Sequence, residues 1–250
     1  FDSVQMEKSK EPGIRLTTNI RFLPTDEHNI AYKAAKLLMD EFQIQEGICI
    51  DIKKCIPVSA GMAGGSTDAA AVLYGMNQTY ELKLSQRQLA KRALTLGADV
   101  PYCLMRGTAL AEGIGEELTR LPAVPRCPVV IAKPGISVST KWVYDRLVLD
   151  DQTKHPDIDQ LVLDIRQQNL EQLASHMGNI LEDVTVSEYP VIAHIKENLM
   201  AHGALNAMMS GSGPTVFALF EERAKAREAA DALRESGLAR QIYVTTIFNV

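Results

Sequence analysis

Apolar residues in the first part of the chain recur at two different spacings. Between residues 30 and 38 they recur at i, i+4, i+7 and i+8, which is the spacing of a helix with one buried face. From residue 48 to 53 isoleucine alternates with Cys, Asp and Lys, which predicts a half-buried strand that runs toward Pro57. A second helical face follows over residues 69–76. The predicted order is therefore strand, glycine-rich loop, helix.

The next segment ends in a predicted loop. Apolar residues at 89, 93 and 96 indicate a third helix, which Gly97 would end. The residue before Pro101 is biased away from helical angles, so we expect a loop that displays Asp99. Apolar runs at residues 108–111 and 129–132 predict strands.

The second half of the chain alternates in the same way. Helices are predicted near Thr140, over 158–167, after Pro190 and over 226–233, and strands over 204–209, 215–220 and 241–248. Three prolines cluster between Pro122 and Pro128, which favours a domain boundary there. We therefore predict two α/β domains, residues 1–125 and 126–250.

Composition narrows the class of protein. Of 250 residues 46% are apolar and 23% are charged, with 26 Lys and Arg against 31 Asp and Glu. A formal net charge of −5 gives no basic footprint for a phosphate backbone, so we expect no nucleic-acid partner. Chain length is sufficient for a core without disulfides or a structural metal.

Cysteine usage and the absence of a hydrophobic span suggest where the protein acts. The four cysteines, Cys49, Cys55, Cys103 and Cys127, form no CxxC pair, which is typical of reduced thiols in a cytoplasmic protein. No apolar run approaches the roughly 18 residues of a membrane helix, so no membrane partner is expected. The chain begins with Phe1, and we expect it to start partway through a longer protein.

The glycine-rich loop between Pro57 and Thr67 carries the strongest chemical signal. Its glycines let backbone amides approach a ligand, and amides at the start of the following helix would bind a polyphosphate. No lysine lies between Lys54 and Lys83, so a Walker A loop is excluded, and the GxGxxG dinucleotide pattern is absent. A flexible connection capped by Ser66 remains the alternative reading.

Two further motifs are weak when taken singly. An aspartate at position 99, between a helix end and a proline, is on residue type alone more often a turn residue than a catalytic one. The run Ser210-Gly-Ser-Gly-Pro-Thr215 also fits a tight hairpin between two strands. The five histidines have no metal-binding spacing, so no protein-bound metal is expected.

Taken together and in this order, the motifs resemble those of the GHMP kinase superfamily. Residues 57–70 are similar to the family's phosphate-loop motif, and residues 209–215 are similar to its C-terminal glycine motif. Further similarity lies at residues 29–35, 97–101, 133–134 and 139–144. The resemblance runs from about Thr17 to the C-terminus.

This resemblance implies an α/β (α+β) fold of two domains, an N-terminal domain with the phosphate loop and a C-terminal domain of ferredoxin-like type. It also implies an ATP-dependent kinase that uses ATP and Mg²⁺. The acceptor would be the 2-hydroxyl of a small-molecule substrate, a cytidine diphosphate methylerythritol, in isoprenoid precursor biosynthesis. We expect a cytoplasmic monomer or weak homodimer.

The resemblance also assigns roles to residues. Asp99 matches the family's catalytic aspartate, which accepts or orients the proton of the substrate hydroxyl. Residues matching the nucleotide site are Asn29, Ile30, Lys54, Pro57, Val58, Ser59, Ala60, Gly61, Met62, Ala63, Gly64, Gly65, Ser66 and Thr67. Residues matching the substrate site are Thr140, Tyr144, Gly211, Ser212 and Gly213.

One departure leaves alternatives open. The family's Pro-Ala-Lys-Ile-Asn motif and its Gly-Tyr-His segment do not occur in this chain, and Lys8 and Lys10 lie in a polar run that does not match. Either that segment precedes Phe1, or this is a kinase-like protein without part of its site. The alternatives are another GHMP small-molecule kinase and a non-catalytic nucleotide-binding protein of this family.

Overall fold

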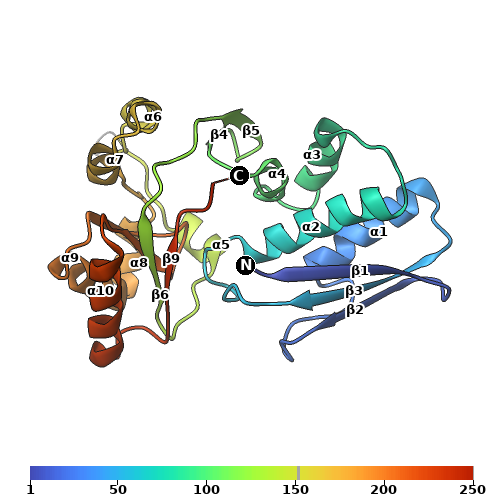
Figure 1. Ribbon diagram of the computed structural model, residues 1–250, viewed down its shortest axis with the longest axis horizontal. Helices are drawn as coiled ribbons and strands as arrows, with labels where there is room; N and C mark the ends of the chain where they lie inside the picture. The colour runs from blue at the N-terminus through green and yellow to red at the C-terminus, as the bar shows by residue number, and fades with distance from the viewer. Residues whose placement is uncertain (151–152, 250) are drawn as a thin grey trace. The chain divides into compact units, whose positions relative to one another are not determined.

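The computed structural model describes residues 1–150 and 153–249, which fall into two compact units (Figure 1). The first unit comprises Phe1–Val58 with Ala63–Thr119, and the second comprises Ser59–Met62 with the chain from Arg120 onward. A short piece of the glycine-rich loop thus clusters with the second unit. The domain boundary that we predict after residue 125 remains a prediction.

A three-stranded sheet forms the base of the first unit. Its strands are β1 (Ser3–Ser9), β2 (Ile14–Thr18) and β3 (Gly47–Lys53), in the order β1-β3-β2. Strand β3 pairs antiparallel with β1 and parallel with β2. Ile48, Ile50 and Ile52 are at most 1% exposed, so the alternation predicted for this strand is confirmed.

Helices cover one face of this sheet and extend beyond it. Figure 1 shows α1 (Ile30–Phe42) and α2 (Gly64–Thr79) side by side over the strands. It shows α3 (Gln86–Leu94) and α4 (Val100–Met105) on the side of α2 that faces away from the strands. The hairpin of β4 (Ala109–Glu112) and β5 (Glu117–Arg120) follows. The core consists of the β3 isoleucines and the inner faces of α1 and α2, including Leu38, Leu73 and Met76.

The loop predicted to display Asp99 is confirmed, whereas the helix after it begins earlier than the proline rule indicates. Residues 95–99 lie outside the helices, Asp99 is exposed, and α4 begins at Val100. The bias against helical angles before proline is overridden because Pro101 lies in the first turn, where its missing N–H would have no intrahelical acceptor. Helix α2 begins at Gly64 after a left-handed Ala63, so Ser66 is not its cap.

The second unit contains a four-stranded antiparallel sheet. Its strands are β6 (Pro128–Lys133), β7 (Asn206–Met209), β8 (Val216–Leu219) and β9 (Gln241–Thr246), in the order β7-β8-β6-β9. Numbered along the chain within the sheet, this is the order 2-3-1-4, and helices separate β6 from β7 and β8 from β9. The sheet therefore has the ferredoxin-like arrangement that the resemblance implied.

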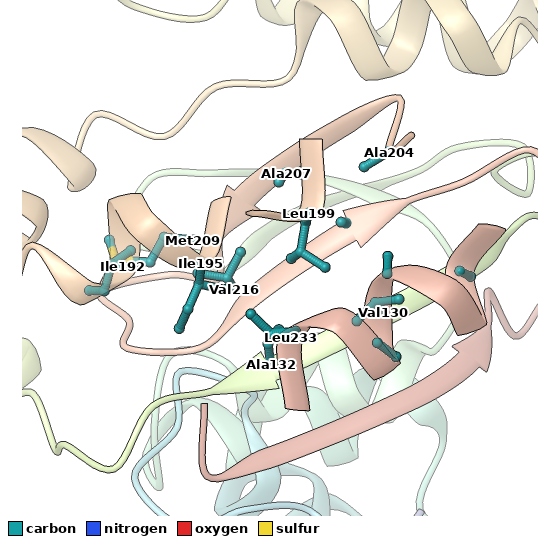
Figure 2. Packing of buried hydrophobic residues seen from close by; sticks show 14 of the residues in the cluster. Val130, Ala132, Ile192, Ile195, Leu199, Ala204, Ala207, Met209, Val216 and Leu233 are labelled. Carbon is teal, nitrogen blue, oxygen red and sulfur yellow. The ribbon is translucent and has the colours of Figure 1, made fainter. Parts of the chain in front are cut away.

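Helices pack on both faces of this sheet. They are α5 (Thr140–Tyr144), α6 (Ile158–Gln167), α7 (Leu170–His176), α8 (Glu182–Glu188), α9 (Val191–Ala201) and α10 (Arg223–Ser236). Figure 2 shows side chains of α9 and α10, among them Ile195 and Leu233, packed against Val130 and Val216 of the strands. The alternate residue Val129 faces the opposite side, where it packs in a smaller cluster with Ala174 of α7.

Several elements have no counterpart in the predicted pattern. They are β1, β2, β5, α7 and α8, which are short segments with few apolar residues or with mixed periodicity. Tertiary packing stabilises such segments more than their own propensity does. Within residues 1–150 and 153–249 no helix is long and apolar enough to cross a membrane.

Candidate active site

The backbone of the glycine-rich loop alternates in and out of the left-handed region. Ser59, Gly61 and Ala63 have φ angles of 52°, 68° and 49°. Two of these residues are not glycine, and left-handed angles are uncommon for residues with a Cβ. Successive amides in such alternating conformations form a concave nest that binds anions. The loop therefore has a backbone suited to a phosphate group.

The start of α2 adds free donors next to this loop. The first hydrogen bond of the helix runs from the Thr67 amide to the Ala63 carbonyl, so the amides of residues 64–66 precede the hydrogen-bond ladder. The helix dipole places partial positive charge at the same point. Thr67 Oγ1 also donates to the Ala63 carbonyl, which fixes the turn in the absence of a capping side chain.

Three of the predicted segments meet around the start of α2 within the first unit. The side chain of Ile30 lies beside two of the glycines: its Cγ2 is 3.5 Å from the Cβ position of Gly65, and its Cδ1 is 3.8 Å from that of Gly97. The ends of α1, α2 and α3 therefore converge where the resemblance places a nucleotide.

Asn29 serves as a helix cap at this point. Its Oδ1 accepts from the Ala31 amide at 2.9 Å, and its Nδ2 donates to the Pro24 carbonyl at 2.7 Å. The side chain is buried and both of its polar atoms are engaged. Its role beside adenine stays a prediction.

Lys54 lies beneath the loop in a buried charge cluster. Its ammonium pairs with Asp2 and, at 2.7 Å, with Asp68 on α2. Lys54 Nζ lies 3.2 Å from the Cβ position of Gly64, and all three charged side chains are at most 5% exposed. The role of Lys54 beside adenine stays a prediction, and its contacts here are with two carboxylates.

The two carboxylates of this cluster differ in pKa. Burial raises the pKa of Asp68 to about 6, against the lowering effect of the Lys54 hydrogen bond. Burial also acts on Asp2, but hydrogen bonds from Lys54 and from two backbone amides outweigh it, so the pKa of Asp2 is lowered. Among the residues that the structure describes, Asp68 Oδ1 has no hydrogen-bond partner, so burial of this oxygen is not offset by a donor.

Asp99 lies at the first turn of α4 with an exposed carboxylate. As the N-cap residue it makes no side-chain capping bond, so its oxygens are free to meet a ligand. One turn later, Cys103 Sγ lies 3.5 Å from Thr67 Oγ1, which places α4 against the first turn of α2. Asp99 thus lies directly before a helix that packs on the first turn of α2.

The second unit brings its own predicted residues together. Ser210 Oγ donates to the Gly61 carbonyl at 2.8 Å, and a Cβ added at Gly61 would overlap the Ser210 carbonyl oxygen. Ser59–Met62 therefore lies directly on the turn of residues 210–213. Thr140 Oγ1 and Ser212 Oγ are 2.9 Å apart, whereas the Tyr144 ring is 59% exposed and remains available to a ligand.

Comparison with known proteins decides the family. Residues 29–107 match the model of the GHMP kinases N terminal domain, and residues 161–238 match that of the GHMP kinases C terminal domain. A 4-diphosphocytidyl-2-C-methyl-D-erythritol kinase of Lachnospira eligens is 52% identical over 248 residues, 99% of this chain and 86% of the relative. The chain belongs to the GHMP kinase family. A kinase of the same name from Clostridium perfringens is 45% identical over 100% of this chain and 86% of its own length.

Solved structures agree with this assignment to the GHMP kinases. A crystal structure of 4-(cytidine 5'-diphospho)-2C-methyl-D-erythritol kinase superposes with a TM-score of 0.81 at 31% identity, covering 98% of this chain and 85% of that one. Homoserine kinase from Cytophaga hutchinsonii has a TM-score of 0.80 at 23% identity, covering 100% and 85%. The second similarity shows the shared fold.

Sequence reasoning missed several residues that support this GHMP kinase site. Asp68 is a charged residue directly before Ala69 and Ala70 on the buried face of α2, a signal that could have marked it as paired. Asp2 carries no such signal. Asn179 and Glu182 both bind Met209, directly before the turn of residues 210–213, and come from a segment without a recognised motif.

Proposed function

We propose that this chain transfers the γ-phosphate of ATP to the 2-hydroxyl of 4-diphosphocytidyl-2-C-methyl-D-erythritol. The observation that carries the proposal is the loop of residues 59–67, whose left-handed residues and free helix amides suit a polyphosphate. Kinases with this activity in their names are 45–52% identical over nearly the whole chain, which supports the choice of acceptor.

Phosphoryl transfer requires mainly alignment and charge stabilisation from the protein. In the proposed reaction the substrate oxygen attacks the γ-phosphorus, the bond to the ADP oxygen breaks, and the hydroxyl proton passes to Asp99. The amides of residues 64–66 hold the phosphates, and Thr140 and Tyr144 with Gly211, Ser212 and Gly213 hold the acceptor. Ile30, Pro57 and Val58 would pack on the nucleotide.

Mg²⁺ belongs to this proposal as an ion carried by the nucleotide. Among the described residues there is no group of three or more His, Cys, Asp or Glu that could hold a metal ion. Mg²⁺ commonly binds through one or two protein oxygens together with substrate phosphates, and the hydroxyl of the exposed Thr67 at the start of α2 fits that need. Bound Mg²⁺ would neutralise charge on the phosphates.

An acceptor assay tests the function. Purified chain is incubated with Mg-ATP and 4-diphosphocytidyl-2-C-methyl-D-erythritol, mevalonate or homoserine, and ADP and phosphorylated product are measured by chromatography and mass spectrometry. We expect product with the cytidylyl substrate alone. The Lachnospira eligens kinase is the positive control, because it is 52% identical to this chain and the match covers 86% of its length. Product with mevalonate or homoserine instead would contradict the proposed acceptor.

A further inference from the structure

The turn of residues 210–213 is held by side chains from α8 and the residues just before it. Asn179 Nδ2 donates to two carbonyls, that of Met209 at 2.9 Å and that of Gly211 at 2.8 Å. Glu182 Oε1 accepts from the Met209 amide at 2.6 Å. Thr185 Oγ1 donates to the Ser212 carbonyl at 3.3 Å. These three side chains therefore hold the backbone at Met209, directly before the turn, and at Gly211 and Ser212 within it.

The same turn contacts two parts of the proposed site. Ser210 reaches the Gly61 carbonyl in the phosphate loop, and Ser212 pairs with the hydroxyl of Thr140. Gly61 has a left-handed φ and no room for a Cβ, so its position depends on where the turn lies. A displacement of the turn would therefore move Gly61, with the loop amides next to it, and the Thr140 hydroxyl together.

We propose that Asn179, assisted by Glu182 and Thr185, is a positioning residue that sets the geometry of the phosphate loop through the 210–213 turn. The inference rests on the proposed function. Asn179 touches no reacting atom in this scheme. It acts because its one amide nitrogen donates to the carbonyls of Met209 and Gly211, the two residues on either side of Ser210.

Asn179 has a second, purely local role that an experiment must separate. Its Oδ1 accepts from the Leu181 amide at 3.0 Å at the beginning of α8. Asn179→Asp retains this acceptor, but it replaces the donating nitrogen with an oxygen that faces two carbonyl oxygens. Asn169 offers a matched control, because its Oδ1 accepts from the Gln172 amide at 3.1 Å as the cap of α7. Asn169→Asp keeps that single bond.

The measurement is the Kd of a non-hydrolysable Mg-ATP analogue by calorimetry, together with amide hydrogen exchange over residues 208–213. We expect Asn179→Asp to raise Kd about tenfold or more, because the carbonyls of buried Met209 and exposed Gly211 both lose their donor, and to speed exchange in the turn. In kinetics, KM for ATP should rise more than kcat falls. Asn169→Asp should match the parent in Kd, in amide exchange over residues 208–213 and in KM for ATP.

Thr185→Val provides a second variant of nearly equal volume, which removes one hydroxyl donor from a fully buried position. We expect Thr185→Val to raise the Kd of the Mg-ATP analogue as well, but less than Asn179→Asp does. If Asn179→Asp does not fold, the Kd of Thr185→Val tests the positioning role instead. A Kd within twofold of the parent in the folded variants would overturn the positioning role. A parent that binds ATP but transfers no phosphate would overturn the proposed function alone, while a parent that does not bind ATP would overturn both.

Discussion

Gly61 offers a sharp test of the contact between the phosphate loop and the 210–213 turn. Its φ is 68°, and a Cβ added there would overlap the Ser210 carbonyl oxygen and lie 3.0 Å from that of Gly213. Both neighbours are backbone atoms and cannot rotate away. Gly61→Ala therefore forces either a strained residue against the turn or a separation of loop and turn.

The expected loss of stability in Gly61→Ala has two separate sources. A residue with a Cβ in the left-handed region costs about 1–2 kcal/mol relative to glycine. Overpacking against an unyielding neighbour adds about 1–3 kcal/mol. Gly237 allows the first cost to be measured alone, since its φ is also 68° and nothing lies within 4 Å of its Cβ position. Gly237→Ala should therefore cost only about 1–2 kcal/mol.

Both glycines belong to the second unit, so the two variants can be compared in the unfolding of one compact body. Chemical denaturation gives the free energy of unfolding, and calorimetry gives the affinity for an ATP analogue. We expect Gly61→Ala to lose more stability than Gly237→Ala, or, if the loop separates from the turn, to lose nucleotide affinity instead. Equal unfolding free energies with unchanged ATP affinity in both variants would refute the close packing of loop and turn.

Three further predictions concern the first unit. Asp99→Asn retains shape but removes basicity, so turnover should fall roughly 10²–10⁴-fold with little change in ATP affinity, and near-normal kcat would remove Asp99 from the mechanism. Gly65→Val places methyl groups above the loop amides, where its Cβ would meet only Ile30 Cγ2 at 3.5 Å, so calorimetry should show weaker ATP binding with little loss of stability. The pKa of Asp68 is raised from 3.8 to about 6, so between these pH values the folded state keeps a proton that the unfolded chain releases. The stability that this proton gives the folded state is therefore complete below about pH 4 and is lost as pH rises through 6. Asp68→Asn should flatten that decline, about 2–3 kcal/mol in the free energy of unfolding between pH 4 and 7, and an unchanged slope would contradict the raised pKa.

Elements with a strong period could be predicted from the sequence, and so could the family. The isoleucines of β3 alternate without interruption, and the buried faces of α1 and α2 repeat at helical spacing. Motif order carried more information than any single motif, because the phosphate loop and the 210–215 run each fit an ordinary turn. Similarity to named kinases confirms the assignment that this order indicated.

Contacts between distant segments could not be predicted in this way. Asp2 and Asp68 are 66 positions apart, yet both pair with Lys54. The side chains that hold the 210–213 turn include Asn179, before α8, and residues of α8 itself, a seven-residue helix with one fully buried polar residue and no clear period. Such pairings depend on the three-dimensional path of the backbone, and hydrophobic periodicity contains no record of it. The proline rule failed at Val100 because a preference of the isolated chain yields to a first-turn position in a packed helix.

The absence of a lysine from the phosphate loop makes these supporting contacts more important. A loop that binds phosphate through backbone amides has no long side chain that can follow a shifted ligand, so its affinity depends on how well the amides are held. Gly61 is held by the turn that contains Ser210, and Gly64 lies beside the Lys54 ammonium. The strained angles at Ser59 and Ala63 persist because both flanks are fixed. In the proposed site, preorganised backbone dipoles would therefore take the place of the electrostatic attraction that a lysine supplies, and their geometry would depend on the side chains that hold the loop.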